Sequence, residues 1–361
     1  LHTIAACDPR ASRWTERIPV MALSPLWWRL GRRVGHHFPP RLRTRAFGRL
    51  VERPEVTAVL CHYANFALRL ESVWQRTSKP VFVHCHGYDV TWDRRHPDGR
   101  RFHAPDYEQQ VRDLASRVIL VANSRRTAER LRAIRVPDER IVIKYLGVPV
   151  PDEPPARPDR TTNLSVLYLG RLVDFKGPDR TIEAFDLACR DGLDATLLVA
   201  GDGPLRERCE ALVRALPHGD RVRLLGAVEH GEGERLRATS DIFTAHNQTG
   251  PDTGQEEAFG VSIVEAMAGA LPVVTGRSGA LSEVIESPRD GILFEPGDVA
   301  RHASVLRRLG EHPDERRRLG RAAWTTARER FSVQREARVL RELLVEPVTD
   351  ASGTLRSSPA C

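Results

Sequence analysis

The chain has 361 residues, of which 41% are hydrophobic and 29% are charged, the balance of a globular protein with room for two domains. No apolar run approaches the roughly 20 residues of a membrane-spanning helix, and the first residues do not resemble a signal peptide. The formal charge is +7, but 48 acidic residues are interspersed among 55 basic ones and no nucleic-acid-binding motif is present, so we expect a mixed solvated surface and no nucleic-acid partner.

The cysteines are scattered along the chain without a C-x-x-C pair. This spacing argues against a disulfide framework and against a structural zinc site. We therefore expect a reducing, cytoplasmic compartment. The six cysteines are Cys7, Cys61, Cys85, Cys189, Cys209 and Cys361.

In the first part of the chain, short apolar runs alternate with helical patterns. Strand, helix and strand in this order predict a parallel sheet, which we assign to a first domain over residues 1–150. The predicted strands are 57–61, 80–85, 118–122 and 140–144, and the predicted helices are 109–116 and 124–134.

Residues 21–50 combine aromatic side chains with arginines. This composition is typical of a segment that lies on an anionic lipid surface. An exposed loop and helix of the first domain is the alternative. The segment therefore allows peripheral membrane contact at the inner face of the membrane without requiring it.

A proline-dense stretch at 149–162 is typical of an extended interdomain linker. After it, strands and amphipathic helices alternate regularly, which predicts a doubly wound domain over residues 151–345 whose ligands lie beyond the carboxyl ends of the strands. The polar residues 346–361 are expected to be a disordered tail. The predicted strands are 164–169, 195–200, 222–225, 242–245, 272–275 and 291–294.

The first strand of the second domain runs into a glycine turn that carries two cations. Arg171 and Lys176 are five residues apart, between Gly170 and Gly177, and a helix follows. Two cations together with backbone N–H groups at a helix start can hold a diphosphate. The alternative is an ordinary strand-to-helix turn with two solvated cations.

Two acidic side chains lie eight residues apart around the next candidate loop. Glu257 is expected in a loop at the mouth of the sheet, where a carboxylate can bind sugar hydroxyls, and Glu265 about one turn into the following helix, where it can bind ribose hydroxyls. Each has a structural alternative. Ser262 and Glu265 have the spacing of a capping box, and Glu257 could be one of two solvated loop acids.

Three motifs together resemble the retaining glycosyltransferase family 4, also called the group 1 glycosyltransferases. They are Gly-Arg-Leu-x-x-x-Lys-Gly from Gly170, Ala-Gly-Asp-Gly-Pro from Ala200, and Glu-x-Phe-Gly-x-x-x-x-Glu-Ala-Met-Ala from Glu257. The resemblance covers roughly residues 57–345. It implies an α/β protein of the GT-B fold, in which two Rossmann-like domains face each other across a cleft.

The resemblance also implies an activity and roles for residues. The enzyme would transfer a hexosyl group from a nucleotide-sugar to a hydroxyl of a sugar, lipid-linked or small-molecule acceptor with retention, in polysaccharide or glycolipid synthesis, without a metal or other cofactor. A lipid-linked acceptor would fit the membrane contact that residues 21–50 allow. Arg171 and Lys176 would bind the donor diphosphate, Glu265 the ribose, and Glu257 would lie beside the transferring sugar. Backbone groups of residues 259–261 would contact sugar and phosphate; these are Phe259, Gly260 and Val261.

In the first domain, the strand ending in His86-Gly-x-Asp89 resembles the family's strand that places a histidine near the donor sugar. We therefore expect His86 to be catalytic, and His62 matches a site position less firmly. Alternation places His84 on the same face as His86, where it could be a core histidine. No third ligand is suggested nearby, so a zinc site is not expected.

The chain begins at Leu1, and the Gly-Gly loop with which family members usually open is not found. This predicts either a truncated or a divergent first unit. The alternative function is a catalytically degenerate GT-B scaffold that binds partners.

Overall fold

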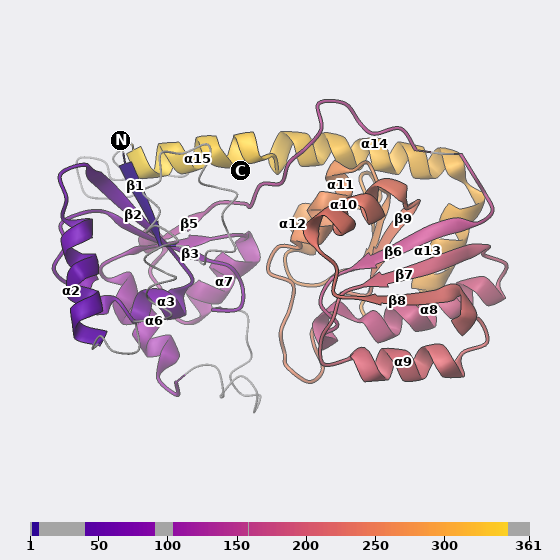
Figure 1. The fold of residues 1–361 in the computed structure, drawn as a ribbon, viewed down its shortest axis with the longest axis horizontal. Coiled ribbons are helices and arrows are strands. Elements are labelled where there is room, and N and C mark those ends of the chain that lie inside the picture. Colours follow the sequence, from indigo (N-terminus) through magenta and orange to yellow (C-terminus); the bar gives the residue numbers. More distant parts are fainter. Residues whose placement is uncertain (1, 7–39, 91–103, 158, 346–361) are drawn as a thin grey trace. The chain divides into compact units, whose positions relative to one another are not determined.

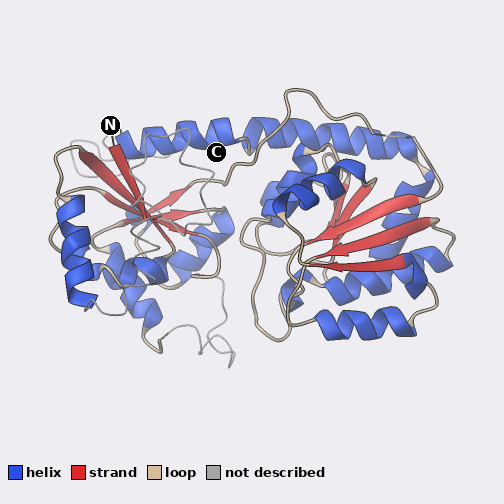
Figure 2. Cartoon of the chain, in the orientation of Figure 1, coloured by secondary structure: helices blue, strands red, loops and turns tan. Residues whose placement is uncertain are grey.

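The computed structural model describes residues 2–6, 40–90, 104–157 and 159–345. By its contacts the chain divides into two compact units, each with its own parallel sheet (Figures 1 and 2). Unit 1 contains the described residues up to Tyr145 together with those from Glu336, and unit 2 runs from Leu146 to Arg335.

The sheet of unit 1 has five parallel strands in the order β1-β2-β3-β4-β5. Its first strand, β1, was not among the predicted elements. The strands are β1 (His2–Ala6), β2 (Val56–His62), β3 (Val81–Cys85), β4 (Ile119–Ala122) and β5 (Ile141–Ile143). The helices are α2 (Pro40–Val51), α3 (Ala64–Leu68), α4 (Glu71–Trp74), α6 (Tyr107–Ala115), α7 (Arg125–Ala133) and, at the end of the described residues, α15 (Val333–Val345).

Alternation along the strands of unit 1 separates two apolar layers. Odd-numbered residues of β2 and β3, such as Val59 and Val83, join a core with the helices α3, α6 and α7. Even-numbered residues, such as Leu60 and Phe82, pack instead against leucines of α15. The face under α15 is therefore the one on which His62 and His84 also lie.

The sheet of unit 2 has six parallel strands in the order β11-β10-β9-β6-β7-β8. The strand order reverses between β6 and β9, and in doubly wound sheets ligands bind beyond the carboxyl ends of the strands at such a point. The strands are β6 (Leu164–Leu169), β7 (Ala195–Ala200), β8 (Val222–Gly226), β9 (Ile242–Ala245), β10 (Val273–Gly276) and β11 (Ile292–Phe294). The helices are α8 (Pro178–Arg190), α9 (Arg206–Ala215), α10 (His230–Thr239), α11 (Val261–Ala268), α12 (Leu281–Val284), α13 (Val299–Glu311) and α14 (Pro313–Arg330).

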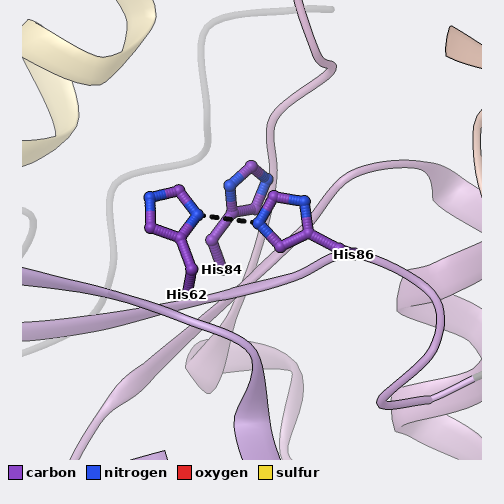
Figure 3. A group of neighbouring side chains, drawn as sticks. All are labelled: His62, His84 and His86. Carbon is purple, nitrogen blue, oxygen red and sulfur yellow. Dashed lines mark hydrogen bonds between the residues drawn. The ribbon is translucent and has the colours of Figure 1, made fainter. Parts of the chain in front are cut away.

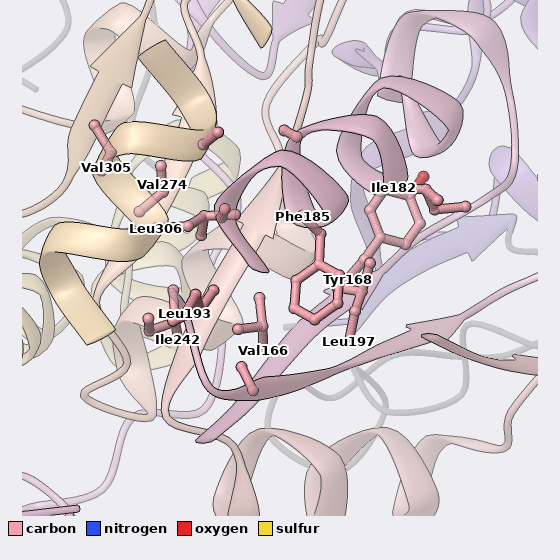
Figure 4. Close-up of a cluster of buried hydrophobic side chains, with 14 of the residues drawn as sticks. Val166, Tyr168, Ile182, Phe185, Leu193, Leu197, Ile242, Val274, Val305 and Leu306 are labelled. Carbon is pink, nitrogen blue, oxygen red and sulfur yellow. The ribbon is translucent and has the colours of Figure 1, made fainter. Parts of the chain in front are cut away.

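The main core of unit 2 lies between this sheet and the helices α8 and α13 (Figure 4). Phe185 of α8 and Leu306 of α13 are fully buried against Val166 of β6. Burying one such side chain contributes about 1.5–3 kcal/mol of hydrophobic free energy. This packing fixes the central strand β6, which leads directly into the glycine turn.

The prediction of an α/β fold with two Rossmann-like units is confirmed, and the bounds of most predicted elements differ by a few residues. The division of the chain differs at α15. We expected residues up to 345 in the second domain, but the chain from Glu336 packs with unit 1 because the leucines of α15 cover its sheet.

Two predicted segments fall largely outside the described residues. The tail 346–361 does so entirely, and of the segment 21–50 only residues from Pro40 are described, as part of α2. Among the described helices, none is long and apolar enough to cross a bilayer.

Candidate active site

The glycine turn after β6 brings backbone segments of unit 2 into very close contact at the reversal of strand order. A Cβ on Gly201 would lie 1.8 Å from the carbonyl oxygen of Gly170, and one on Gly177 would lie 2.2 Å from that of His246. Gly177 also has a φ of 56°, in the left-handed region that glycine adopts without strain. These glycines therefore let the loops after β6, β7 and β9 converge.

Arg171 and Lys176, the two predicted cations, both lie near the ring of Phe175. The Arg171 guanidinium carbon is 5.7 Å from the ring centroid and the Lys176 ammonium is 5.5 Å from it, both within cation–π range. Phe175 itself is buried, while Arg171 is exposed. The turn thus holds two cationic groups beside one aromatic ring at the end of the sheet.

Glu257 forms an ion pair with Lys176 and is buried. Its Oε2 also accepts a hydrogen bond of 3.1 Å from the Asn247 side chain, and Asn247 in turn accepts one of 3.0 Å from the Thr275 hydroxyl. Asn247 follows β9 and Thr275 lies within β10, so the sheet holds the Glu257 carboxylate in place through these two side chains. The interpretation of Glu257 as a solvated loop acid is wrong.

Glu265 lies on α11 and is only partly buried. Its carboxylate is 3.0 Å from the guanidinium of Arg237 on α10, which is buried. The capping-box alternative is wrong, because the N-cap of α11 is Gly260, with a φ of 89° and no side-chain hydrogen bond to the helix start. Glu265 is therefore held by a cation from another element.

Arg237 was not predicted as a site residue. It belongs to the strongly polar helix α10, where an additional arginine gives no indication of a functional role. Its surroundings place it near the turn, since a Cβ on Gly233 would lie 3.6 Å both from the Arg237 guanidinium and from the side chain of Leu169, the last residue of β6. The spacing Gly233-x-x-x-Arg237, with the glycine one turn before the arginine, is the only trace of this arrangement in the sequence.

The three residues predicted to offer backbone contacts to the donor have different environments. Phe259 is buried and its ring meets that of Phe331 edge-on at 5.6 Å, so its side chain belongs to the core. Gly260 is the N-cap of α11, and Val261, its first residue, is 42% exposed. Their predicted contacts to sugar and phosphate remain a prediction.

His86 lies in unit 1, just after β3, and it is part of a cluster of three histidines (Figure 3). The parallel pairing of β2 with β3 sets His62 opposite His84, and His62 Nδ1 lies 2.8 Å from His86 Nε2. The expectation that no third ligand lies nearby is therefore wrong. The signal was present, since His62 and His86 each follow a predicted strand, and parallel pairing brings such strand ends together.

Burial keeps these imidazoles neutral. It lowers the pKa of His62 to about 4 and lowers the pKa values of His84 and His86 well below the usual value, and the nearby Lys144 cation adds to this effect. Lys144 is itself buried in an ion pair with Glu336 of α15.

Asp89 fixes the turn that carries His86. Its carboxylate accepts hydrogen bonds of 3.0 Å from the backbone N–H groups of His86 and Gly87, and one of 2.9 Å from that of Ala64. Burial raises the pKa of Asp89, and these backbone hydrogen bonds oppose that shift because they stabilise the carboxylate. Asp89 therefore joins the end of β3 to the start of α3, which follows β2.

Comparison with known families and proteins gives one consistent result. Residues 151–325 match the family model described as "Glycosyl transferases group 1". Over 273 residues, 72% of this chain and 68% of the relative, the chain is 27% identical to "GDP-mannose-dependent monoacylated alpha-(1-6)-phosphatidylinositol monomannoside mannosyltransferase" of Corynebacterium glutamicum. It is 30% identical to "Amylovoran biosynthesis glycosyltransferase AmsK" of Erwinia amylovora over 68% of this chain and 58% of that protein.

A third relative matches over a shorter segment. The chain is 32% identical to "GDP-mannose-dependent alpha-(1-6)-phosphatidylinositol dimannoside mannosyltransferase" of Mycobacterium tuberculosis over 44% of this chain and 38% of the relative, so it spans well under half of that protein's length.

Solved structures show the same fold. HepE of Anabaena, in complex with UDP and glucose, has a TM-score of 0.71 at 20% identity, covering 96% of this chain and 92% of HepE. Sucrose-phosphate synthase of Thermosynechococcus elongatus has a TM-score of 0.68 at 20% identity, covering 83% of this chain and 76% of that chain.

Proposed function

The chain belongs to the group 1 glycosyltransferases and has their GT-B fold, and on that premise we propose that it transfers a hexosyl group from a nucleotide-sugar to an acceptor hydroxyl with retention of configuration. The observation that carries this proposal is the ion pair between Lys176, in the glycine turn at the reversal of strand order, and Glu257, in the segment between β9 and α11. The two groups of this ion pair can separate when a ligand binds. The Lys176 ammonium would then bind the diphosphate of the ligand, and the Glu257 carboxylate would bind its sugar.

In this mechanism Lys176 and Arg171 bind the diphosphate. They stabilise the negative charge that develops on it as the bond to the sugar breaks, which is the work that a metal ion does in other transferases. Glu257, released from Lys176, accepts hydrogen bonds from the sugar and stabilises positive charge at the anomeric carbon. Glu265 accepts hydrogen bonds from the ribose hydroxyls.

The acceptor hydroxyl attacks the anomeric carbon from the face that the diphosphate leaves, and the departing diphosphate takes its proton. His86 contributes a neutral imidazole that hydrogen-bonds the donor sugar. The names of the relatives favour a lipid-linked or polysaccharide acceptor. Some of the similar proteins are named for GDP-mannose and a similar structure holds UDP, so both bases belong in a donor screen.

The test is a thermal-shift screen of the full chain against UDP-, GDP- and ADP-sugars, followed by NMR of the product formed from the best donor. A ligand at 100 times its Kd stabilises the folded state by about 2.7 kcal/mol, which raises Tm by several degrees. We expect one nucleotide class to do so, and the product to keep the anomeric configuration of the donor in the presence of EDTA.

The opposite results separate the alternatives. A shift with a donor but no transfer or hydrolysis would favour a catalytically degenerate scaffold. No shift with any donor would overturn the proposal.

A further inference from the structure

The three histidines at the ends of β2 and β3 form the only group of ligand-type side chains, among the described residues, that could hold a metal ion. One nitrogen from each of His62, His84 and His86 lies within 4.8 Å of the other two. Figure 3 shows the three rings gathered above the strand ends, with the His62 and His86 rings joined by their hydrogen bond.

The chemical state of the rings suits coordination. Imidazole binds a metal through the lone pair of an unprotonated nitrogen, and the 2.8 Å hydrogen bond between His62 Nδ1 and His86 Nε2 requires that one of these two nitrogens carries no proton. His84 is fully buried, yet its Nε2 has no hydrogen-bond partner within the part of the chain that the structure describes. A buried polar nitrogen without a partner is costly, which is the reason that almost all such groups are satisfied.

We propose that His62, His84 and His86 form a binding site for a divalent transition-metal ion, with Zn²⁺ as the probe of choice. Zinc–nitrogen bonds of about 2.0–2.1 Å in tetrahedral geometry place ligand nitrogens about 3.4 Å apart. The His62–His86 pair at 2.8 Å has to open slightly, and the widest pair has to close by up to about 1.4 Å, both within reach of side-chain rotation.

Binding requires no net release of protons from the cluster. The ring that carries the proton in the His62–His86 hydrogen bond moves it to its other nitrogen, and the freed lone pair faces the metal. The unpartnered Nε2 of His84 gains a ligand. The metal thus replaces one N–H···N hydrogen bond with three coordination bonds.

The surrounding charges permit a cation. Lys144 is the cation that acts on all three rings, but its charge is balanced by Glu336, with which it is paired. The Asp89 carboxylate holds the His86 backbone in place. His62 and His86 are only partly buried, unlike His84, so a fourth ligand such as water can reach the metal from solvent.

The test measures metal binding by the full chain, produced without a polyhistidine tag and stripped with a chelator. Zn²⁺ affinity is measured by competition with a chromophoric chelator, and Co²⁺ reports geometry through its visible absorption. We expect one equivalent of metal and a tetrahedral Co²⁺ spectrum. His62→Gln at the rim, and His84→Gln if it folds, should each raise the Kd by more than about 100-fold, since changes in outer-shell partners alone cost 10–100-fold.

Two matched controls locate the site. His230→Gln removes a histidine of α10 that pairs with Glu234, and His36→Gln/His37→Gln removes the adjacent histidines outside the described residues. Neither should change the Kd or the Co²⁺ spectrum. Wild-type protein that binds no Zn²⁺ at micromolar concentration, or binding that survives His62→Gln and disappears in the His36/His37 variant, would overturn the proposal.

Discussion

The two units differ in how they accommodate buried polar side chains. At the reversal of strand order in unit 2, charged groups are paired, Lys176 with Glu257 and Arg237 with Glu265. At the strand ends of unit 1, three imidazoles are gathered without charge, and the charged pair Lys144–Glu336 lies nearby. The paired charges can exchange partners with an ionic ligand, whereas the neutral bases offer lone pairs.

The largest effect is expected at the most deeply buried of these pairs. Lys144→Met should lower the free energy of unfolding of unit 1 by about 3–5 kcal/mol, because the buried Glu336 carboxylate then loses the cation with which it is paired. Hydrogen exchange of peptides that cover β5 and α15 measures this locally, which avoids assuming that both units unfold together.

The double variant Lys144→Met/Glu336→Leu should recover most of that loss, since two apolar side chains can replace a buried ion pair. Arg53→Met is the control, because it removes an exposed partner of Glu55 and should cost no more than about 1 kcal/mol. Equal exchange rates in Lys144→Met and the wild type would show that the buried pair does not stabilise unit 1.

The Lys176–Glu257 ion pair of unit 2 should affect the rate of sugar transfer rather than folding. Lys176→Met should lower kcat for sugar transfer by about 100- to 1,000-fold, the range found when one group that stabilises developing charge is removed. Lys79→Met is a matched control, since Lys79 is the remaining lysine of the chain and lies in unit 1. Near-normal turnover in a folded Lys176→Met protein would contradict the assignment of the diphosphate site.

The sequence predicts unit 2 better than unit 1, for a physical reason. The predicted site residues around β6 belong to short motifs of neighbouring residues. Gly177 is required there because a Cβ at this position would collide with the backbone of His246. Arg237 was not predicted because it reaches Glu265 from another helix, and only the glycine one turn before it, Gly233, distinguishes it from its arginine neighbours.

In unit 1 the relevant contacts join residues that are distant in the chain. His62 meets His86 only through the pairing of β2 with β3, and Lys144 meets Glu336 only because α15 returns to the first sheet. Alternation predicted that His84 and His86 share a face, but periodicity does not show which third side chain joins them.

A buried histidine pair in unit 2 extends the comparison to pH. The Gly297 N–H donates to His246 Nε2, so the His246 proton lies on Nδ1 and points to His302 Nδ1, 3.1 Å away; His302 then donates from Nε2 to Thr244. In this network each neutral ring donates one hydrogen bond and accepts one, so an added proton would find no acceptor. Burial lowers the pKa of His246 to about 4, with Arg180 adding to the shift and Asp298 opposing it.

Because the unfolded state binds the proton more tightly, His246 should cost stability as pH falls below about 6.5 towards 4. For this residue the loss between pH 7 and pH 5 is about 2 kcal/mol. Hydrogen exchange in β9 and α13 measures it in unit 2 alone. His246→Gln should reduce the difference between the two pH values, and a difference as large as that of the wild type would assign the pH effect to other groups.

The smallest effect is expected at Arg237, which positions Glu265 without a predicted contact to the donor. Arg237→Met should weaken donor binding about tenfold, or about 1.4 kcal/mol, because Glu265 loses the cation that orients it towards the ribose. The loss should appear in the Kd of the nucleotide diphosphate and in KM, with kcat changed much less, since ribose contacts are equal in the ground and transition states. Arg235→Met, on the same helix and 77% exposed at its side chain, is the control and should bind the nucleotide normally. A fall in kcat at unchanged KM would instead show that Arg237 takes a direct part in the transfer step. Unit 2 would then hold three catalytic cations, Arg171, Lys176 and Arg237, and the paired charges could no longer be described as groups that only bind the donor.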